Sequence, residues 1–83
     1  MKIQIKYFAS IREAVGCASE SLQTQASTLA ELRDELGLRP GAPGGALARG
    51  RTVRMALDQV MSDESAVLYE GCEVAFFPPV TGG

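Results

Sequence analysis

Two stretches of alternating polar and apolar residues, one near each end of the chain, predict the main strands. Between residues 2 and 8, every second side chain is apolar, and Ile3, Ile5 and Tyr7 share one face of an extended backbone. Residues 73–77 alternate in the same way. Because these two segments carry the strongest patterns, we expect them to form the buried centre of a sheet.

Weaker alternation predicts three further strands. Residues 18–24 and 52–57 each alternate over most of their length, and a short strand is expected at residues 60–62. The dipeptide Asp58-Gln59 between the last two segments is a turn candidate. We expect strand 18–24 to pair with the first strand in a hairpin-related arrangement.

Capping patterns predict two helices. Ser10 is followed three residues later by Glu13, which is a capping box, and the short helix that it opens is expected to end at Gly16. Thr28 begins a second capping box, and the helix after it carries leucines at helical spacing up to Gly37. This second helix is expected to be the main one.

The order of these elements predicts an α+β fold, with one main helix packed across a mixed sheet of four or five strands. Residues 37–50 hold five glycines and two prolines and are expected to form a surface loop with one helical turn near residues 46–49. Without a Gly-Lys-Ser/Thr motif, this loop is not a phosphate-binding loop. We expect a single domain over residues 1–77 and an extended tail over residues 78–83.

Composition excludes several classes of function. The chain has 83 residues, 46% of them hydrophobic, which is typical of one small globular domain. Its net charge is -2 and acidic and basic residues are interspersed, so the sequence shows no basic cluster that would bind nucleic acid or a membrane surface. No apolar run reaches the length of a membrane span and the first residues do not resemble a signal peptide, so we expect a cytoplasmic protein.

Side chains suited to catalysis are scarce. The chain contains no histidine, and its acidic residues and cysteines show no metal-ligand spacing, so no metal site and no permanently bound cofactor are expected. Cys17 and Cys72 lie far apart and fit no C-x-x-C motif, which favours two free thiols. A redox or sulfur-handling role for either cysteine is the lesser alternative.

The last residues of the sequence offer the best candidate for chemistry. Gly82 and Gly83 follow a strand and the pair Pro78-Pro79, and two glycines can enter a channel too narrow for any other residue. The prolines hold this segment extended and aim it away from the body. The α-carboxylate of Gly83 is therefore the candidate reacting group. The alternative is that the segment is a frayed chain end without function.

These motifs resemble the small subunit of molybdopterin synthase, the MoaD family. The resemblance rests first on the ending Gly-Cys-Glu-Val-Ala-Phe-Phe-Pro-Pro-Val-Thr-Gly-Gly over residues 71–83. Tyr-Phe-Ala at residues 7–9 and Ala-Leu-Asp-Gln at residues 56–59 are also similar to that family. Asp58 stands where the family usually has Asn, and Cys72 where it usually has Asp. The resemblance implies a β-grasp, or ubiquitin-like, fold.

The resemblance also implies a function as sulfur carrier. In this family an adenylating partner uses ATP to convert the carboxylate of the last glycine, here Gly83, into an acyl-adenylate. Sulfur then replaces AMP and gives a thiocarboxylate, which donates its sulfur to cyclic pyranopterin monophosphate to form molybdopterin. The chain would not be an enzyme on its own, because the catalytic side chains belong to the large subunit.

The implied partners are a large subunit (MoaE-like, with two copies of each chain), an adenylating enzyme (MoeB-like) and a sulfur donor protein. Phe8 and Phe77 fall on the outward faces of their strands, and we expect them to form an exposed patch with Met61 for these partners. The alternative is that the aromatic rings pack under the glycine-rich loop. The remaining residues expected to contact the partners belong to the tail: Pro78, Pro79, Val80 and Thr81.

Two other functions stay open. The chain could be a β-grasp sulfur carrier for another pathway, such as thiamine, cysteine or tRNA thiolation. It could also be a ubiquitin-like modifier whose tail is conjugated to lysines, or an interaction module whose tail is never activated. The ending Phe-Phe-Pro-Pro-Val-Thr-Gly-Gly favours the molybdopterin pathway over the other carriers.

Overall fold

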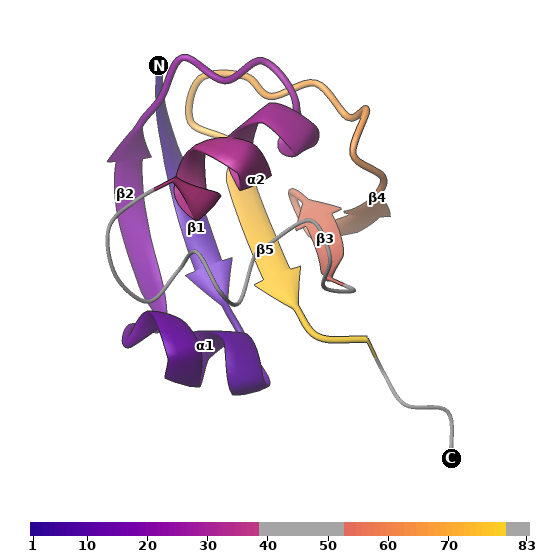
Figure 1. The fold of residues 1–83 in the computed structure, drawn as a ribbon. Coiled ribbons are helices and arrows are strands. Elements are labelled where there is room, and N and C mark those ends of the chain that lie inside the picture. Colours follow the sequence, from indigo (N-terminus) through magenta and orange to yellow (C-terminus); the bar gives the residue numbers. More distant parts are fainter. Residues whose placement is uncertain (39–52, 80–83) are drawn as a thin grey trace.

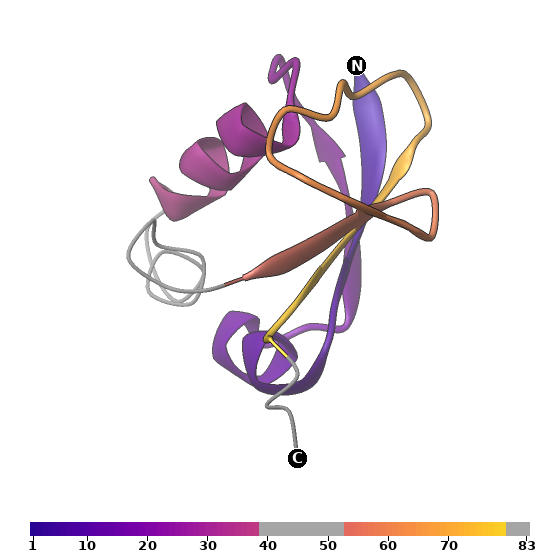
Figure 2. The same cartoon turned by 90° about the vertical axis from the view of Figure 1, so that its right-hand side faces the viewer.

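The computed structural model describes residues 1–38 and 53–79, which form a five-stranded mixed sheet with two helices on one side (Figures 1 and 2). The strand order is β2-β1-β5-β3-β4. The elements are, in chain order, β1 (Lys2–Tyr7), α1 (Ala9–Val15), β2 (Ser19–Gln23), α2 (Leu29–Gly37), β3 (Arg54–Leu57), β4 (Val60–Ser62) and β5 (Glu73–Phe77). The predicted α+β fold is confirmed, with α1 as a second, shorter helix.

The first and last strands lie side by side at the centre of the sheet, as the sequence predicted. β1 and β5 run parallel, with Ile5 opposite Val74 and Tyr7 opposite Phe76. β2 is antiparallel to β1 on one side, and β3 is antiparallel to β5 on the other, with β4 at the edge. Because β1 and β5 are parallel neighbours, the chain leaves β5 at the same end of the sheet where β1 leads into α1.

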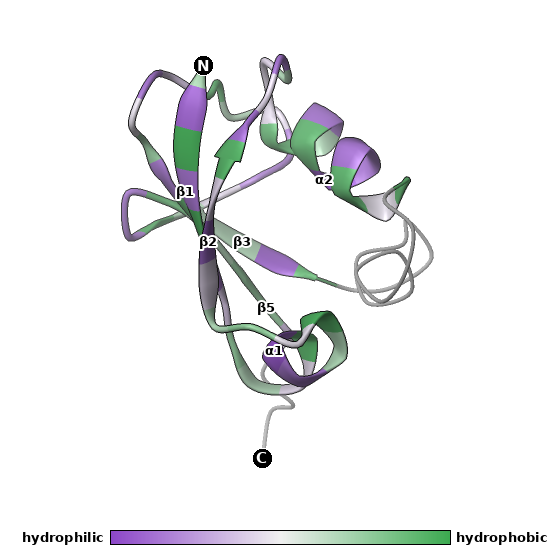
Figure 3. Ribbon diagram, turned by 90° about the vertical axis from the view of Figure 1, so that its left-hand side faces the viewer, coloured by the Kyte–Doolittle hydropathy of each residue, from purple (hydrophilic) through white to green (hydrophobic). Residues whose placement is uncertain are grey.

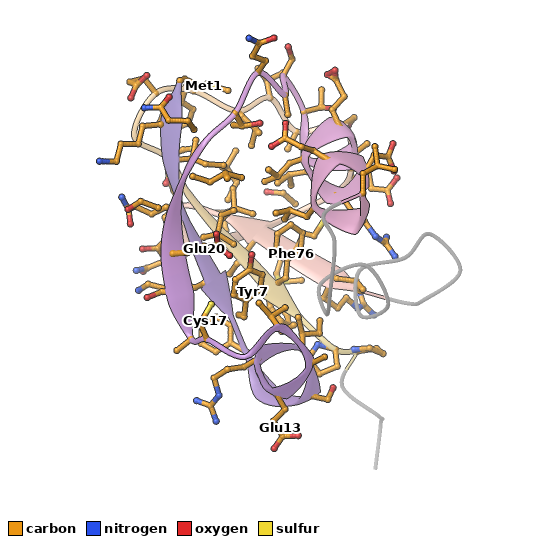
Figure 4. All side chains as sticks on the ribbon, turned by 60° about the vertical axis from the view of Figure 1, so that its left-hand side comes forward. Met1, Tyr7, Glu13, Cys17, Glu20 and Phe76 are labelled. Atoms are coloured by element: carbon orange, nitrogen blue, oxygen red, sulfur yellow. The ribbon has the colours of Figure 1, made fainter. Side chains whose placement is uncertain are left out.

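The core lies between the sheet and the helices. The alternation of β1 and β5 is visible in their burial, since the side chains of Ile3, Ile5, Val74 and Phe76 are all 0% exposed. The apolar residues of α2 face this layer and most of its polar residues lie on the opposite side (Figure 3). Arg33 is the exception, since it is 5% exposed and forms an ion pair with Glu64. Tyr7 stacks against Phe76, with ring centroids 6.2 Å apart, and both rings point into the interior (Figure 4).

The structure corrects the predicted start of the first helix. The capping position belongs to Phe8, whose extended backbone makes no side-chain cap, and Ser10 already lies inside the first turn of α1. The helix starts early because Ala9 adopts a left-handed backbone, with φ of 52°, and turns the chain immediately after β1. The predicted end is confirmed, since Gly16 is left-handed at φ of 92° and its N–H bonds back to the carbonyl of Arg12.

The predicted start and end of the main helix are confirmed. The hydroxyl of Thr28 accepts a hydrogen bond from the N–H of Glu31 and so caps α2, which ends at Gly37. The first two residues of the helix also have partners for their N–H groups in the loop after β4. Leu29 donates to the carbonyl of Ala66 at 3.1 Å, and Ala30 donates to the carbonyl of Glu64 at 3.0 Å. This loop therefore closes the N-terminal end of the main helix.

The turn predicted at Asp58-Gln59 is also confirmed, since both residues have positive φ, of 50° and 70°. The carboxylate of Asp58 accepts a hydrogen bond from the N–H of Glu73 at 2.9 Å, which ties the turn to the start of β5. The helical turn expected near residues 46–49 lies outside the described residues. No helix in the described part of the chain is long and apolar enough to cross a membrane.

Candidate functional site

The tail leaves from the middle of the sheet. β5 ends at Phe77, and Pro78 and Pro79, both half-buried, follow it without regular structure. The candidate reacting residues Gly82 and Gly83 lie outside the described residues, as do the expected contact residues Val80 and Thr81. The structure therefore describes the base of the tail and the surface around it.

Phe8 and Phe77 lie together at the base of the tail. Their rings meet edge to face, with centroids 6.3 Å apart and an angle of 83° between the ring planes. Phe8 is 46% exposed and Phe77 is half-buried. The backbone of Phe8 is tied to β5, since its N–H bonds to the carbonyl of Phe76 at 3.1 Å. The pair thus presents aromatic surface where the tail begins.

Met61 lies on the same face of the sheet as Phe77. It pairs with Ala56 on β3, and Ala56 pairs with Ala75 on β5, two residues before Phe77. Residues paired across strands share a face, as do residues two apart along a strand. Met61 is 55% exposed. The large side chains of Met61 and Phe77 therefore lie on either side of the small side chains of Ala56 and Ala75. We name these five residues the docking face: Phe8, Ala56, Met61, Ala75 and Phe77.

Charged residues flank the docking face. The ammonium group of Lys6 forms an ion pair with the carboxylate of Glu73, at 3.4 Å. Arg54 is exposed and pairs with Phe77 across β3 and β5. On this side of the sheet, β1 and β2 carry mainly polar residues, and the hydroxyl of Ser21 on β2 donates a hydrogen bond to the side chain of Gln4 on β1. The apolar surface is therefore confined to the half of the sheet from which the tail departs.

The two cysteines are free and differ in environment. Cys17 is exposed after α1 (Figure 4), whereas Cys72 is buried in the core cluster. Burial raises the pKa of the Cys72 thiol, and the nearby carboxylates of Asp58 and Glu70 raise it further, against a backbone hydrogen bond that lowers it. A buried thiol that ionises with difficulty is a poor nucleophile, so Cys72 acts as a small core residue.

The described residues contain no group of histidine, cysteine and acidic side chains that could hold a metal ion.

The carboxylate of Glu20 is half-buried beside Tyr7, whose hydroxyl donates a hydrogen bond to it at 2.9 Å (Figure 4). That bond joins β1 to the edge strand β2 and lies on the helix side of the sheet, away from the docking face. It serves packing rather than the site.

Sequence reasoning missed two residues of the docking face. Ala56 and Ala75 have no distinctive side chain, and only the sheet register places them between Met61 and Phe77 on this face, where Ala56 is 6% exposed. It also missed the Lys6–Glu73 ion pair, which joins residues 67 positions apart. Both depend on the pairing of β5 with its neighbours, which a local pattern does not encode.

Comparison with known proteins extends the picture beyond the described residues. The ThiS family model matches residues 5–83. The molybdopterin synthase sulfur carrier subunits of Escherichia coli and Haemophilus influenzae are 35% and 31% identical to the chain, over 98% of it and 99% of each relative. These matches confirm the resemblance drawn from the sequence.

Solved structures agree with this assignment. One is a protein–protein complex of subunits 1 and 2 of the molybdopterin-converting factor of Helicobacter pylori, 26% identical, with a TM-score of 0.67 and full coverage of both chains. SAMP1 of Haloferax volcanii, 21% identical with a TM-score of 0.77 and full coverage of both chains, shows the same fold. The chain belongs to the ThiS family.

Proposed function

We propose that this protein is the sulfur carrier subunit of molybdopterin synthase, and that Gly83 is its reacting residue. The observation that supports the proposal most strongly is the match to two sulfur carrier subunits of that enzyme over 98% of the chain. The described structure adds a central strand that leads directly into the tail, with exposed apolar surface at the tail's base.

The proposed chemistry takes place on the carboxylate of Gly83. A carboxylate oxygen attacks the α-phosphate of ATP in the adenylating partner, so that pyrophosphate leaves and an acyl-adenylate forms. A sulfur nucleophile then attacks the acyl carbon, and AMP leaves with the electron pair of the bond that breaks. The resulting thiocarboxylate donates sulfur to cyclic pyranopterin monophosphate. ATP belongs to the partner, and this chain supplies only the group that is activated.

The chain's own contribution is positioning. The sequence contains no histidine, so we propose that the large subunit provides the acid–base groups for sulfur transfer. Anchoring the body through the docking face makes the reaction of the tail effectively intramolecular, which can lower the barrier by roughly 7–11 kcal/mol in well-aligned cases. Phe8, Met61 and Phe77 are the proposed anchors, and the segment from Pro78 to Gly83 enters the partner's active site.

The proposed partners are a MoaE-like large subunit, in an assembly with two copies of each chain, a MoeB-like adenylating enzyme and a sulfur donor protein. The Helicobacter pylori relative was solved as a complex of subunits 1 and 2, which supports the first of these. Both enzymes must reach Gly83, so we propose that each uses the docking face in turn. The proposal places these steps in the cytoplasm.

A sulfur-transfer assay tests the proposal. The chain carrying a thiocarboxylate at Gly83 is mixed with the large subunit and cyclic pyranopterin monophosphate, and the dithiolene product is measured by mass spectrometry. We expect product only when the thiocarboxylate is present, and none from a chain lacking Gly83. A chain that loads sulfur normally but yields no dithiolene would instead indicate a carrier for another pathway. A chain that is conjugated to lysines of other proteins would indicate a modifier.

A further inference from the structure

The basic side chains of the strands gather on the outer face of the sheet, the face opposite the helices. The strands contain three of them: Lys2, Lys6 and Arg54. Lys2 and Lys6 alternate with the buried residues of β1, and Arg54 lies opposite Phe77 on the docking face. The helix side differs, because α2 carries three acidic residues and its single arginine is buried. A chain with a net charge of -2 therefore presents basic side chains on its outer face.

These cations differ in whether a carboxylate already compensates their charge. The Nζ atom of Lys6 is 3.4 Å from Oε1 of Glu73, the acidic residue that β5 presents on the same face. Arg54 is exposed, and no carboxylate among the described residues forms an ion pair with it. Within the described part of the chain, Arg54 thus carries an unpaired charge.

Strand register places this unpaired charge beside the proposed anchor Phe77. Arg54 and Phe77 are cross-strand partners, so their Cβ atoms lie about 5 Å apart on the docking face. Lys6 lies opposite Ala75, and Lys2 lies four residues earlier on β1. With a strand spacing of about 4.8 Å and a rise of about 3.3 Å per residue, the Cα atom of Lys2 is roughly 20 Å from that of Phe77. That distance exceeds the Debye length, which is about 10 Å at 0.1 M salt.

A partner that binds Phe77 also covers Arg54, because the two side chains are neighbours. An arginine guanidinium stays protonated at physiological pH, so it does not lose its charge on burial. Burying a charge without a partner is strongly unfavourable. A carboxylate offers two oxygen atoms that match the paired N–H donors of the guanidinium, and such hydrogen bonds are among the stronger ones. The surface that fits the docking face therefore combines an apolar pocket for Phe77 with a carboxylate beside it.

We propose that Arg54 pairs with an aspartate or glutamate side chain of the large subunit when that subunit binds the docking face. The inference rests on the proposed function, which supplies the large subunit as the partner. The aromatic rings provide the apolar anchor, and Arg54 fixes the orientation, because a bidentate pair has a defined geometry. A surface with a basic residue at the same place is rejected by charge repulsion.

Binding of charge variants to the large subunit tests the inference. Titration calorimetry at low and at high salt compares the wild type with Arg54→Gln, with Lys2→Gln and with the double variant Lys6→Gln, Glu73→Gln. Lys2→Gln is the matched control, since it removes one positive charge from the same face but far from Phe77. The double variant removes an ion pair without changing the net charge. Thermal unfolding checks that every variant is folded.

We expect Arg54→Gln to raise the Kd for the large subunit roughly 10- to 100-fold at low salt, and less at high salt. Lys2→Gln should stay within about twofold of the wild type, and the double variant within about fivefold. An unchanged Kd in folded Arg54→Gln, or an equal loss in either control, would overturn the inference alone. A wild-type chain that does not bind the large subunit would overturn the proposed function, and the inference with it.

A covalent cross-link identifies the partner group. In the complex of Arg54→Lys with the large subunit, a carbodiimide takes up one oxygen of a nearby carboxylate and activates its acyl carbon. The introduced amine attacks this carbon, an amide bond forms, and the carbodiimide leaves as a urea, so the two joined chains have lost one water. We expect peptide mapping to join position 54 to an aspartate or glutamate of the large subunit. Cross-links from Lys2 or Lys6 alone would contradict the proposed pair.

Discussion

Replacing Phe76 or Phe77 with alanine separates the role of the core from that of the docking face. The two residues are neighbours on β5, yet Phe76 is 0% exposed and stacks on Tyr7, whereas Phe77 is half-buried against the exposed ring of Phe8. The same substitution therefore removes a core side chain in one variant and an interface side chain in the other.

The expected stabilities differ by several kcal/mol. Truncating a buried Phe costs about 3–5 kcal/mol. At about 0.05–0.15 kcal/mol per residue, the whole domain has roughly 4–12 kcal/mol of stability, so Phe76→Ala should lose a large part of it and melt far below the wild type. Phe77→Ala loses the edge-to-face pair, worth about 0.5–1.5 kcal/mol, together with some partly buried surface. We expect a cost near 1–2 kcal/mol, which lowers Tm by roughly 4–16 °C.

Binding should show the opposite order of sensitivity. An interface anchor typically contributes about 2 kcal/mol or more, so Phe77→Ala should bind the large subunit roughly 30-fold more weakly than the wild type. Thermal unfolding by circular dichroism and titration calorimetry with the large subunit measure the two effects. Phe8→Ala serves as the matched variant and should behave like Phe77→Ala. If Phe77→Ala unfolds while Phe76→Ala stays folded, or if Phe77→Ala binds as tightly as the wild type, the docking face is wrongly assigned.

Three further experiments test separate parts of the account. The double variant Cys17→Ser, Cys72→Ser should load and deliver sulfur, at a stability cost from the buried Cys72 site alone; loss of delivery in the folded variant would reveal a relay thiol. Thr28→Ala should destabilise the fold by about 0.5–2 kcal/mol through loss of its cap, whereas Ser10→Ala should be nearly neutral; equal losses in urea unfolding would contradict the cap assignment. One residue added after Gly83 should prevent ATP-dependent adenylation in a pyrophosphate-release assay, because it moves the reacting carbonyl; normal release would contradict the choice of Gly83.

Much of the fold follows from local pattern, because the first and last strands alternate strongly enough to fix which face is buried. The predicted cap at Ser10 failed for a physical reason. The Ser-x-x-Glu pattern describes two side chains and the backbone between them. The helix, however, begins directly after its N-cap Phe8, and Ala9 turns the chain two residues after Tyr7, the last residue of β1. The Thr28 cap succeeded because an irregular segment precedes it, which leaves the capping residue free to adopt extended backbone.

The candidate site was only partly predictable. Alternation put Phe8 and Phe77 on outward faces, but their contact depends on the parallel register of β1 and β5, which joins distant parts of the chain. The same register brings Ala75 into the docking face and Lys6 to Glu73. Sequence patterns can assign a side chain to a face, and only the assembled sheet decides which side chains on that face are neighbours.

The most direct test of the proposed function is the intact mass of the chain after incubation with the adenylating enzyme, ATP and a sulfur donor. We expect a gain equal to the difference between one sulfur and one oxygen atom, located at Gly83 by fragmentation and absent without ATP. A chain lacking Gly83 should stay folded and show no gain. An unchanged mass in the complete chain, or an equal gain in the chain without Gly83, would contradict the proposal that this protein carries sulfur on its C-terminal glycine.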